Sequence, residues 1–150
     1  MDKISITNHQ SCGGRYPKYL SLIIIFLIIY LSVNAMGEQK RFVASVDQDG
    51  VQRVEIIGGD YYFTPNDIVL KVNVPVELKI RKEKGITPHD FIIKAPEAGM
   101  DINEGISTEP KIIKFTPTKT GKFPFYCGKK LPFSKSHRER GMEGIIEVTE

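Results

Sequence analysis

The feature that most constrains the fold is a series of short, alternating apolar segments separated by turn residues, which runs from residue 41 to the C-terminus. Val76-Glu77-Leu78-Lys79-Ile80 shows the pattern best, because its apolar and charged side chains alternate as in a strand with one buried face. Strands are predicted at residues 42–46, 51–57, 68–72, 76–80, 89–95, 111–115, 122–127 and 144–148. With no long amphipathic helix, these eight or so strands predict an all-β Greek-key sandwich.

Two stretches are expected to connect strands. Pro96 to Glu109 is polar and has room for a short helical turn. The second stretch follows Cys127, and there Pro132 at a turn start and Gly141 as a C-cap favour a short helix over about residues 133–140.

An apolar run near the N-terminus predicts export. Residues 20–33, LSLIIIFLIIYLSV, carry no charge, follow Lys3, Arg15 and Lys18, and precede Val33-Asn34-Ala35. As a helix the run spans about 21 Å, less than the ~30 Å of a bilayer core. These features predict a signal peptide, residues 1–35, cleaved near Ala35. An uncleaved anchor formed by residues 20–33 is the alternative, and both predictions place residues 36–150, a single domain, in the periplasm or cell envelope.

The charge balance argues against a nucleic-acid partner. The chain has 21 Lys and Arg against 18 Asp and Glu. Removal of residues 1–35 takes away three bases and one acid, which leaves a net charge of +1. Nucleic-acid-binding domains usually carry a strong basic excess.

Few side chains of the predicted domain can bind a soft metal, and most of them fall in two motifs. His89 lies in TPHDFII, and Cys127, His137 and Met142 lie in FPFYCGKKLPFSKSHRERGMEG. The remaining His and Cys, His9 and Cys12, precede the apolar run. Two imidazoles, a thiolate and a weak axial thioether are the ligands of a blue-copper site. The sequence therefore predicts one copper ion per chain, bound by these four residues.

Other chemistries fit less well. A structural zinc site needs four strong N or S ligands, and methionine is not one of them. A binuclear copper centre needs two cysteines in the loop, and residues 128–136 contain none. A Cys–His nucleophile lacks an evident orienting residue, and no Ser-elbow, Walker or dinucleotide motif is present. The protein is therefore expected not to be an enzyme.

The chain resembles the cupredoxins, the plastocyanin and azurin superfamily, over roughly residues 41–150. Four segments carry the resemblance in the family's order: YYFTPNDI at residues 61–68, TPHDF at 87–91, FTP through GKFPFYC at 115–127, and GMEG followed by IIEV at 141–148. The resemblance implies a cupredoxin sandwich and a copper site that carries single electrons between larger redox partners. A periplasmic copper-binding or copper-delivery protein is the alternative.

The segment between Cys127 and His137 departs from the family pattern. It holds nine residues, GKKLPFSKS, where plastocyanin-like and azurin-like proteins have about two to four. This segment and the residues that follow form a basic loop, which contains Lys129, Lys130, Lys135, Arg138 and Arg140 and, as an acid, only Glu139. It is interpreted either as a solvated surface or as a docking patch for an acidic redox partner. The protein is expected to be a monomer that contacts a membrane only if residues 20–33 are retained.

Overall fold

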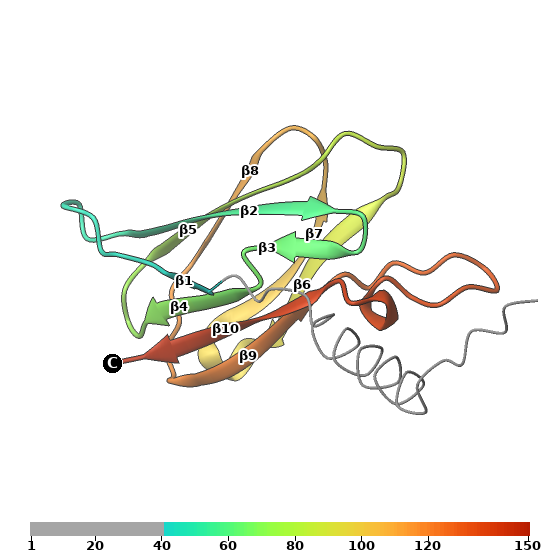
Figure 1. The fold of residues 1–150 in the computed structure, drawn as a ribbon. Coiled ribbons are helices and arrows are strands. Elements are labelled where there is room, and N and C mark those ends of the chain that lie inside the picture. Colours follow the sequence, from blue (N-terminus) through green and yellow to red (C-terminus); the bar gives the residue numbers. More distant parts are fainter. Residues whose placement is uncertain (1–40) are drawn as a thin grey trace, which may run out of the picture. The chain divides into compact units, whose positions relative to one another are not determined.

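The computed structural model describes residues 41–150, and these residues confirm the predicted all-β sandwich (Figure 1). The strands are β1 (Arg41–Val43), β2 (Gln52–Gly59), β3 (Tyr62–Thr64), β4 (Asp67–Lys71), β5 (Val76–Lys82), β6 (His89–Ala95), β7 (Met100–Ile106), β8 (Lys111–Phe115), β9 (Gly121–Tyr126) and β10 (Glu143–Thr149). The helical elements of this part of the chain are two 3-10 turns, η1 (Pro96–Ala98) and η2 (Arg138–Arg140).

The strands form two sheets. One has six strands in the order β1-β4-β10-β9-β6-β7, and the other has four in the order β3-β2-β5-β8. Strand β4 lies parallel to both β1 and β10, whereas β9, β6 and β7 pair antiparallel. Strand β10 pairs antiparallel with β9. Neighbouring strands in a sheet are therefore often distant in sequence.

The core lies between the two inner faces, as the alternation in the sequence requires. In β5, Val76, Leu78 and Ile80 are buried, while the intervening Lys79 is exposed. The opposite sheet contributes buried side chains such as Phe91, Ile93, Phe125 and Ile146. Full burial of one such side chain stabilises the fold by about 1.5–3 kcal/mol.

Two strands were not predicted from the sequence. Strand β7 lies in the stretch expected to be a connection, where only η1 matches the predicted helical turn. Its Met100, Ile102 and Ile106 are buried between more exposed polar residues, so it is a one-faced edge strand whose Asn and Gly mask the β pattern. Strand β3 has three residues, too few to show any periodicity.

The predicted helix over residues 133–140 is wrong. Phe133 has a positive φ of 58°, and the only helical turn here is η2. A residue in the left-handed region cannot continue a right-handed helix. Gly141 does end η2 as predicted, in the left-handed conformation at φ 99°.

Residues 1–35, predicted to be a signal peptide or anchor, lie outside the described residues, as do His9 and Cys12. Residues 41–150 contain no helix with the length and apolar character needed to span a membrane.

Candidate metal centre

Strand pairing brings the predicted ligands to one end of the sandwich. His89 is the first residue of β6, Cys127 follows the last residue of β9, and Met142 precedes β10. Because β6 and β10 both run antiparallel to β9, the starts of β6 and β10 lie beside the end of β9. Three of the four predicted ligands are thus fixed at strand termini.

The fourth, His137, is returned to this end by the basic loop. Its backbone N–H donates to the Lys129 carbonyl at 2.8 Å, and the Met142 N–H donates to the His137 carbonyl at 3.0 Å. The Cys127 N–H in turn donates to the Met142 carbonyl at 3.0 Å. These hydrogen bonds hold His137 beside both Cys127 and Met142, so nine intervening residues do not prevent the predicted juxtaposition.

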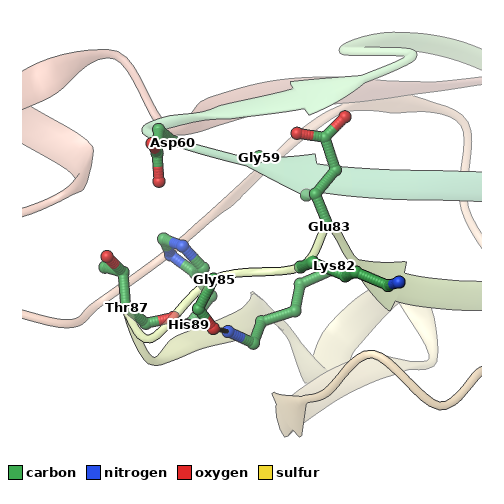
Figure 2. A pocket seen from close by; sticks show the side chains of 9 residues that line it. Gly59, Asp60, Lys82, Glu83, Gly85, Thr87 and His89 are labelled. Carbon is green, nitrogen blue, oxygen red and sulfur yellow. Dashed lines mark hydrogen bonds between the residues drawn. The ribbon is translucent and has the colours of Figure 1, made fainter.

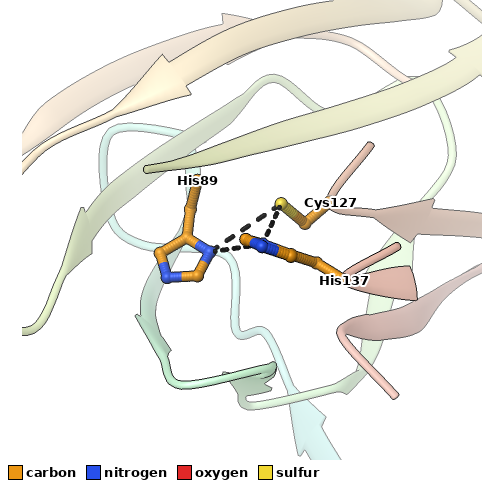
Figure 3. A group of neighbouring side chains, drawn as sticks. All are labelled: His89, Cys127 and His137. Carbon is orange, nitrogen blue, oxygen red and sulfur yellow. Dashed lines mark hydrogen bonds between the residues drawn. The ribbon is translucent and has the colours of Figure 1, made fainter. Parts of the chain in front are cut away.

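His89, Cys127 and His137 place three donor atoms around a common point (Figure 3). The two Nδ1 atoms lie 3.1 Å apart, and the Cys127 Sγ lies 3.4 Å from Nδ1 of His137 and 3.8 Å from Nδ1 of His89. A divalent metal bound at about 2.0 Å by imidazole and about 2.3 Å by thiolate holds such ligand atoms about 3.3–3.8 Å apart. The three donors therefore have the spacing that one metal ion requires.

Met142 belongs to the same assembly, although it forms no part of the three-donor cluster. Its side chain is fully buried, and its terminal methyl packs beside Gly58 of β2. Its backbone contacts to Cys127 and His137 place it next to the cluster. Its role as axial ligand stays a prediction.

Burial sets the protonation states of the cluster. The pKa of His89 is lowered chiefly by desolvation, and further by repulsion between its protonated form and that of His137 and by the Lys82 charge. The pKa of His137 is lowered by desolvation and by Arg140. Burial raises the pKa of the Cys127 thiol to about 11. The imidazoles are therefore neutral at pH 7 and ready to bind a metal, while the thiol must lose a proton when a metal binds.

Asp90 supports the cluster, and sequence analysis assigned it no role. Its backbone N–H points at the Cys127 Sγ at 3.5 Å, and its carboxylate accepts a 2.6 Å hydrogen bond from the Gly128 N–H. The signal was its position directly after His89 in TPHDF. A hydrogen bond to a ligating sulfur is one of the features that tune the potential of a copper–thiolate site.

Tyr61, the first residue of the YYFTPNDI motif, covers His137. The two rings meet edge to face with centroids 5.0 Å apart. The Arg140 guanidinium lies 4.5 Å from the Tyr61 ring centroid. His137 is only 2% exposed, so the basic loop does not present it openly to solvent.

The basic loop itself exposes both apolar and charged side chains. Phe133 is fully exposed and Leu131 is half-exposed. Lys129 lies 3.6 Å from the Asp90 carboxylate, and Arg138 forms a 2.8 Å ion pair with Glu143. The remaining loop lysines, Lys130 and Lys135, form no ion pair among residues 41–150.

Comparisons with known proteins identify the family. The chain matches the cupredoxin-like domain over residues 21–137, a range that includes His89, Cys127 and His137 and ends before Met142. None of the curated proteins matches the chain.

Solved structures resemble the fold. The Cu(I)-bound metal binding domain of the Streptococcus pneumoniae D39 Cu(I) exporting P-type ATPase CopA is 22% identical, with a TM-score of 0.58 and coverage of 76% of this chain and 100% of that one. A copper binding protein in the apo form is 24% identical, with a TM-score of 0.52 and coverage of 74% and 99%. Reduced auracyanin from Roseiflexus castenholzii is 16% identical, with a TM-score of 0.52 and coverage of 71% and 99%.

At these identities the structures establish the fold alone, while the family match spans more than half of the chain. Together with the two-sheet architecture and the three donors at one end of it, that match confirms the resemblance seen in the sequence. The chain belongs to the cupredoxin-like domain family.

Proposed function

We propose that this protein is an exported electron carrier with one copper ion, bound in the plane by His89, Cys127 and His137 and axially by Met142. The observation that carries the proposal is the buried cluster of two imidazole Nδ1 atoms and one thiol sulfur, 3.1–3.8 Å apart. Copper in such a site supplies a one-electron couple between Cu(I) and Cu(II).

The residues around the cluster favour electron transfer over catalysis. His89, Cys127 and Met142 are fixed at strand ends, which limits rearrangement between oxidation states. All four side chains are buried, so a substrate has no direct path to an open coordination position. The raised pKa of the Cys127 thiol also argues against a nucleophilic cysteine, which needs a lowered one.

Copper handling is the second candidate. It is supported by the similarity to the metal binding domain of a Cu(I) exporting ATPase and to a copper binding protein. The burial of every candidate ligand favours retention of the ion over its rapid transfer, and therefore supports the carrier function.

The cellular setting follows from the sequence. Export, with residues 1–35 cleaved or retained as an anchor, places the protein in the periplasm or cell envelope. Its partner is a redox protein, acidic where it meets the basic loop, and the carrier acts as a monomer with no nucleic-acid partner and no enzymatic activity of its own.

The experiment loads the purified protein with Cu(II) and records metal content, the optical spectrum and a voltammogram. The carrier function requires one copper per chain, a thiolate-to-copper charge-transfer band and a reversible one-electron wave. Cys127→Ser should abolish the band. Tight binding of one copper with no reversible wave would favour copper handling, and unchanged Cu(II) affinity and spectrum in Cys127→Ser would refute the site.

A further inference from the structure

The burial of every candidate ligand raises the question of how an ion reaches them. His89 is 4% exposed and His137 is 2% exposed, while Cys127 and Met142 are fully buried. Tyr61 covers His137, with the Arg140 guanidinium over the tyrosine ring. A fixed positive charge on that side opposes the approach of a cation.

A small pocket opens on the other histidine. It has a volume of about 40 Å³ and lies between the end of β2 and the loop before β6. Its wall residues include Asp60, Lys82, Glu83 and His89. One water needs roughly 10–15 Å³ of such free volume, so the pocket has room for an ion that keeps part of its water shell.

His89 belongs to both the pocket and the cluster. Its Nδ1 faces Cys127 and His137 (Figure 3), while its ring also forms part of the pocket wall (Figure 2). The His89 imidazole therefore links the pocket to the three-donor cluster.

The pocket has two basic and two acidic wall residues, Lys82 and Lys84 against Asp60 and Glu83. The Lys82 ammonium donates to the carbonyls of Gly85 and Thr87 at 2.5 and 2.9 Å, and so holds the loop in place. The Asp60 carboxylate points toward the His89 ring, whereas Glu83 extends away from it (Figure 2). Asp60 is therefore the anionic oxygen donor directed at the buried histidine.

We propose that this pocket is the route of copper uptake, and that Asp60 receives a partly hydrated Cu(II) ion before His89 passes it to Cys127 and His137. Oxygen and imidazole nitrogen are the donors that suit Cu(II), whereas Cu(I) favours softer ligands. The route rests on the copper site proposed above. It assigns Asp60 to the rate of loading and not to the final coordination.

The test measures uptake rate and equilibrium affinity separately. Reduced apo-protein is mixed with Cu(II) in a stopped-flow instrument, and the charge-transfer band is followed at low ionic strength. Asp60→Asn should lower the second-order rate constant about tenfold, the lower end of electrostatic acceleration. The dissociation constant at equilibrium, measured by competition with a chelator, should stay within about twofold of wild type, because the variant changes only the route.

Glu109→Gln is the matched control. It removes one negative charge, as Asp60→Asn does. Glu109 lies two residues after Ser107, whose carbonyl accepts a 2.7 Å hydrogen bond from the backbone N–H of the pocket residue Lys82. Glu109 itself does not line the pocket. Equal rates for the Asp60 and Glu109 variants would overturn the route. The route would also be overturned if Arg140→Gln took up copper faster and Asp60→Asn then had no effect on the rate, because the ion would enter past His137.

Three further outcomes are decisive. A loss of equilibrium copper in Asp60→Asn would make Asp60 part of the binding site and refute its assignment to uptake alone. Wild-type protein that binds no copper would refute the proposed function, and the uptake route with it. Wild-type loading with no effect of Asp60 would refute the route and leave the copper site intact.

Discussion

The Asp90 carboxylate accepts a 2.6 Å hydrogen bond from the backbone N–H of Gly128. The two residues directly follow His89 and Cys127, so the bond ties the segment that carries one ligand to the segment that carries another. Within the basic loop, the Ser134 hydroxyl bonds to the neighbouring carbonyls of Leu131 and Lys135, and the Ser136 hydroxyl bonds to the Glu139 carboxylate at 2.7 Å, so these bonds are local to the loop.

Asp90→Ala should destabilise the apo-protein. The change removes the acceptor and leaves the Gly128 N–H unpaired in a part-buried position, which costs about 1–3 kcal/mol. Urea denaturation of the apo-protein measures the loss. Asp90→Asn keeps a carbonyl oxygen in the same place and should retain most of the stability. Equal losses of stability in Asp90→Ala and Asp90→Asn would assign the effect to the negative charge of Asp90 and its contact with Lys129 instead.

The apo-protein should become less stable as the pH falls below about 6.5. The pKa values of His89 and His137 are lowered in the folded state, so the unfolded chain binds more protons between the folded values and about 6.5. Stability therefore rises with pH across that window, by up to about 1.4 kcal/mol per pH unit for each histidine, and levels off below the folded values.

Urea midpoints between pH 7.5 and 5 measure this dependence. Carboxylates also titrate toward the acid end, so the informative quantity is the difference between wild type and His89→Gln. The free energy of unfolding of the variant should depend less steeply on pH than that of wild type. An equal pH dependence in the two proteins would show that His89 is not held neutral by burial.

Met142→Leu should leave the fold intact and raise the reduction potential. The two side chains have similar volumes, and such exchanges in a core usually cost less than about 1.5 kcal/mol. Removal of a thioether donor disfavours Cu(II) relative to Cu(I). Voltammetry of the loaded variant, with copper content as the control, measures the shift. A lowered potential would contradict the axial role of Met142.

Electron transfer to an acidic partner should slow as salt rises. Lys130 and Lys135 are exposed on the basic loop, and the screening length shortens from about 30 Å at 0.01 M to about 10 Å at 0.1 M ionic strength. Replacement of both lysines with Gln should slow the low-salt rate and flatten its salt dependence, with an unchanged copper spectrum.

Lys119 and Lys122 provide the control for that experiment. Both are exposed, near the start of β9 and therefore at the opposite end of that strand from Cys127. Their replacement with Gln makes the same change in net charge. If the two double variants behave alike, the basic loop is only a solvated surface.

Gly144→Ala should destabilise the fold more than an ordinary surface change. A Cβ at Gly144 would overlap the Phe125 ring and the Asn66 carbonyl, which itself accepts a 2.8 Å bond from the Ile145 N–H. Overpacking of this kind costs about 1–3 kcal/mol. Gly105→Ala in β7 meets nothing within 4 Å and should be close to neutral in the same urea assay. A neutral Gly144→Ala would show that β10 can shift to make room.

Sequence reasoning predicted the strands whose inner face is fully apolar, such as β5, and missed those whose pattern is short or interrupted. Strand β7 contains Asn103 and Gly105, and local sequence reveals neither its pairing with β6 nor the packing of its apolar side chains in the core. Of the two end signals for the helix expected over residues 133–140, Gly141 does end a helical turn, but Phe133 adopts the left-handed conformation, which the local sequence does not signal.

The candidate ligands were predictable because their chemistry is rare in this chain. One cysteine and two histidines occur between residues 36 and 150, and all three meet in the cluster. The supporting residues were not predictable in the same way. Asp90, Tyr61 and Asp60 are common residue types, and their roles follow from where the fold places them.

The wide separation of the donors along the chain has a consequence for the protein's lifetime. His89 and Cys127 are 38 residues apart and meet only when β6 pairs with β9, so the unfolded chain holds no preformed site. Copper held by all four donors would then stabilise the native state by mass action, by up to about 4.1 kcal/mol at a thousand times the dissociation constant. Proteases cleave chains that open, so copper supply would determine how long each molecule survives.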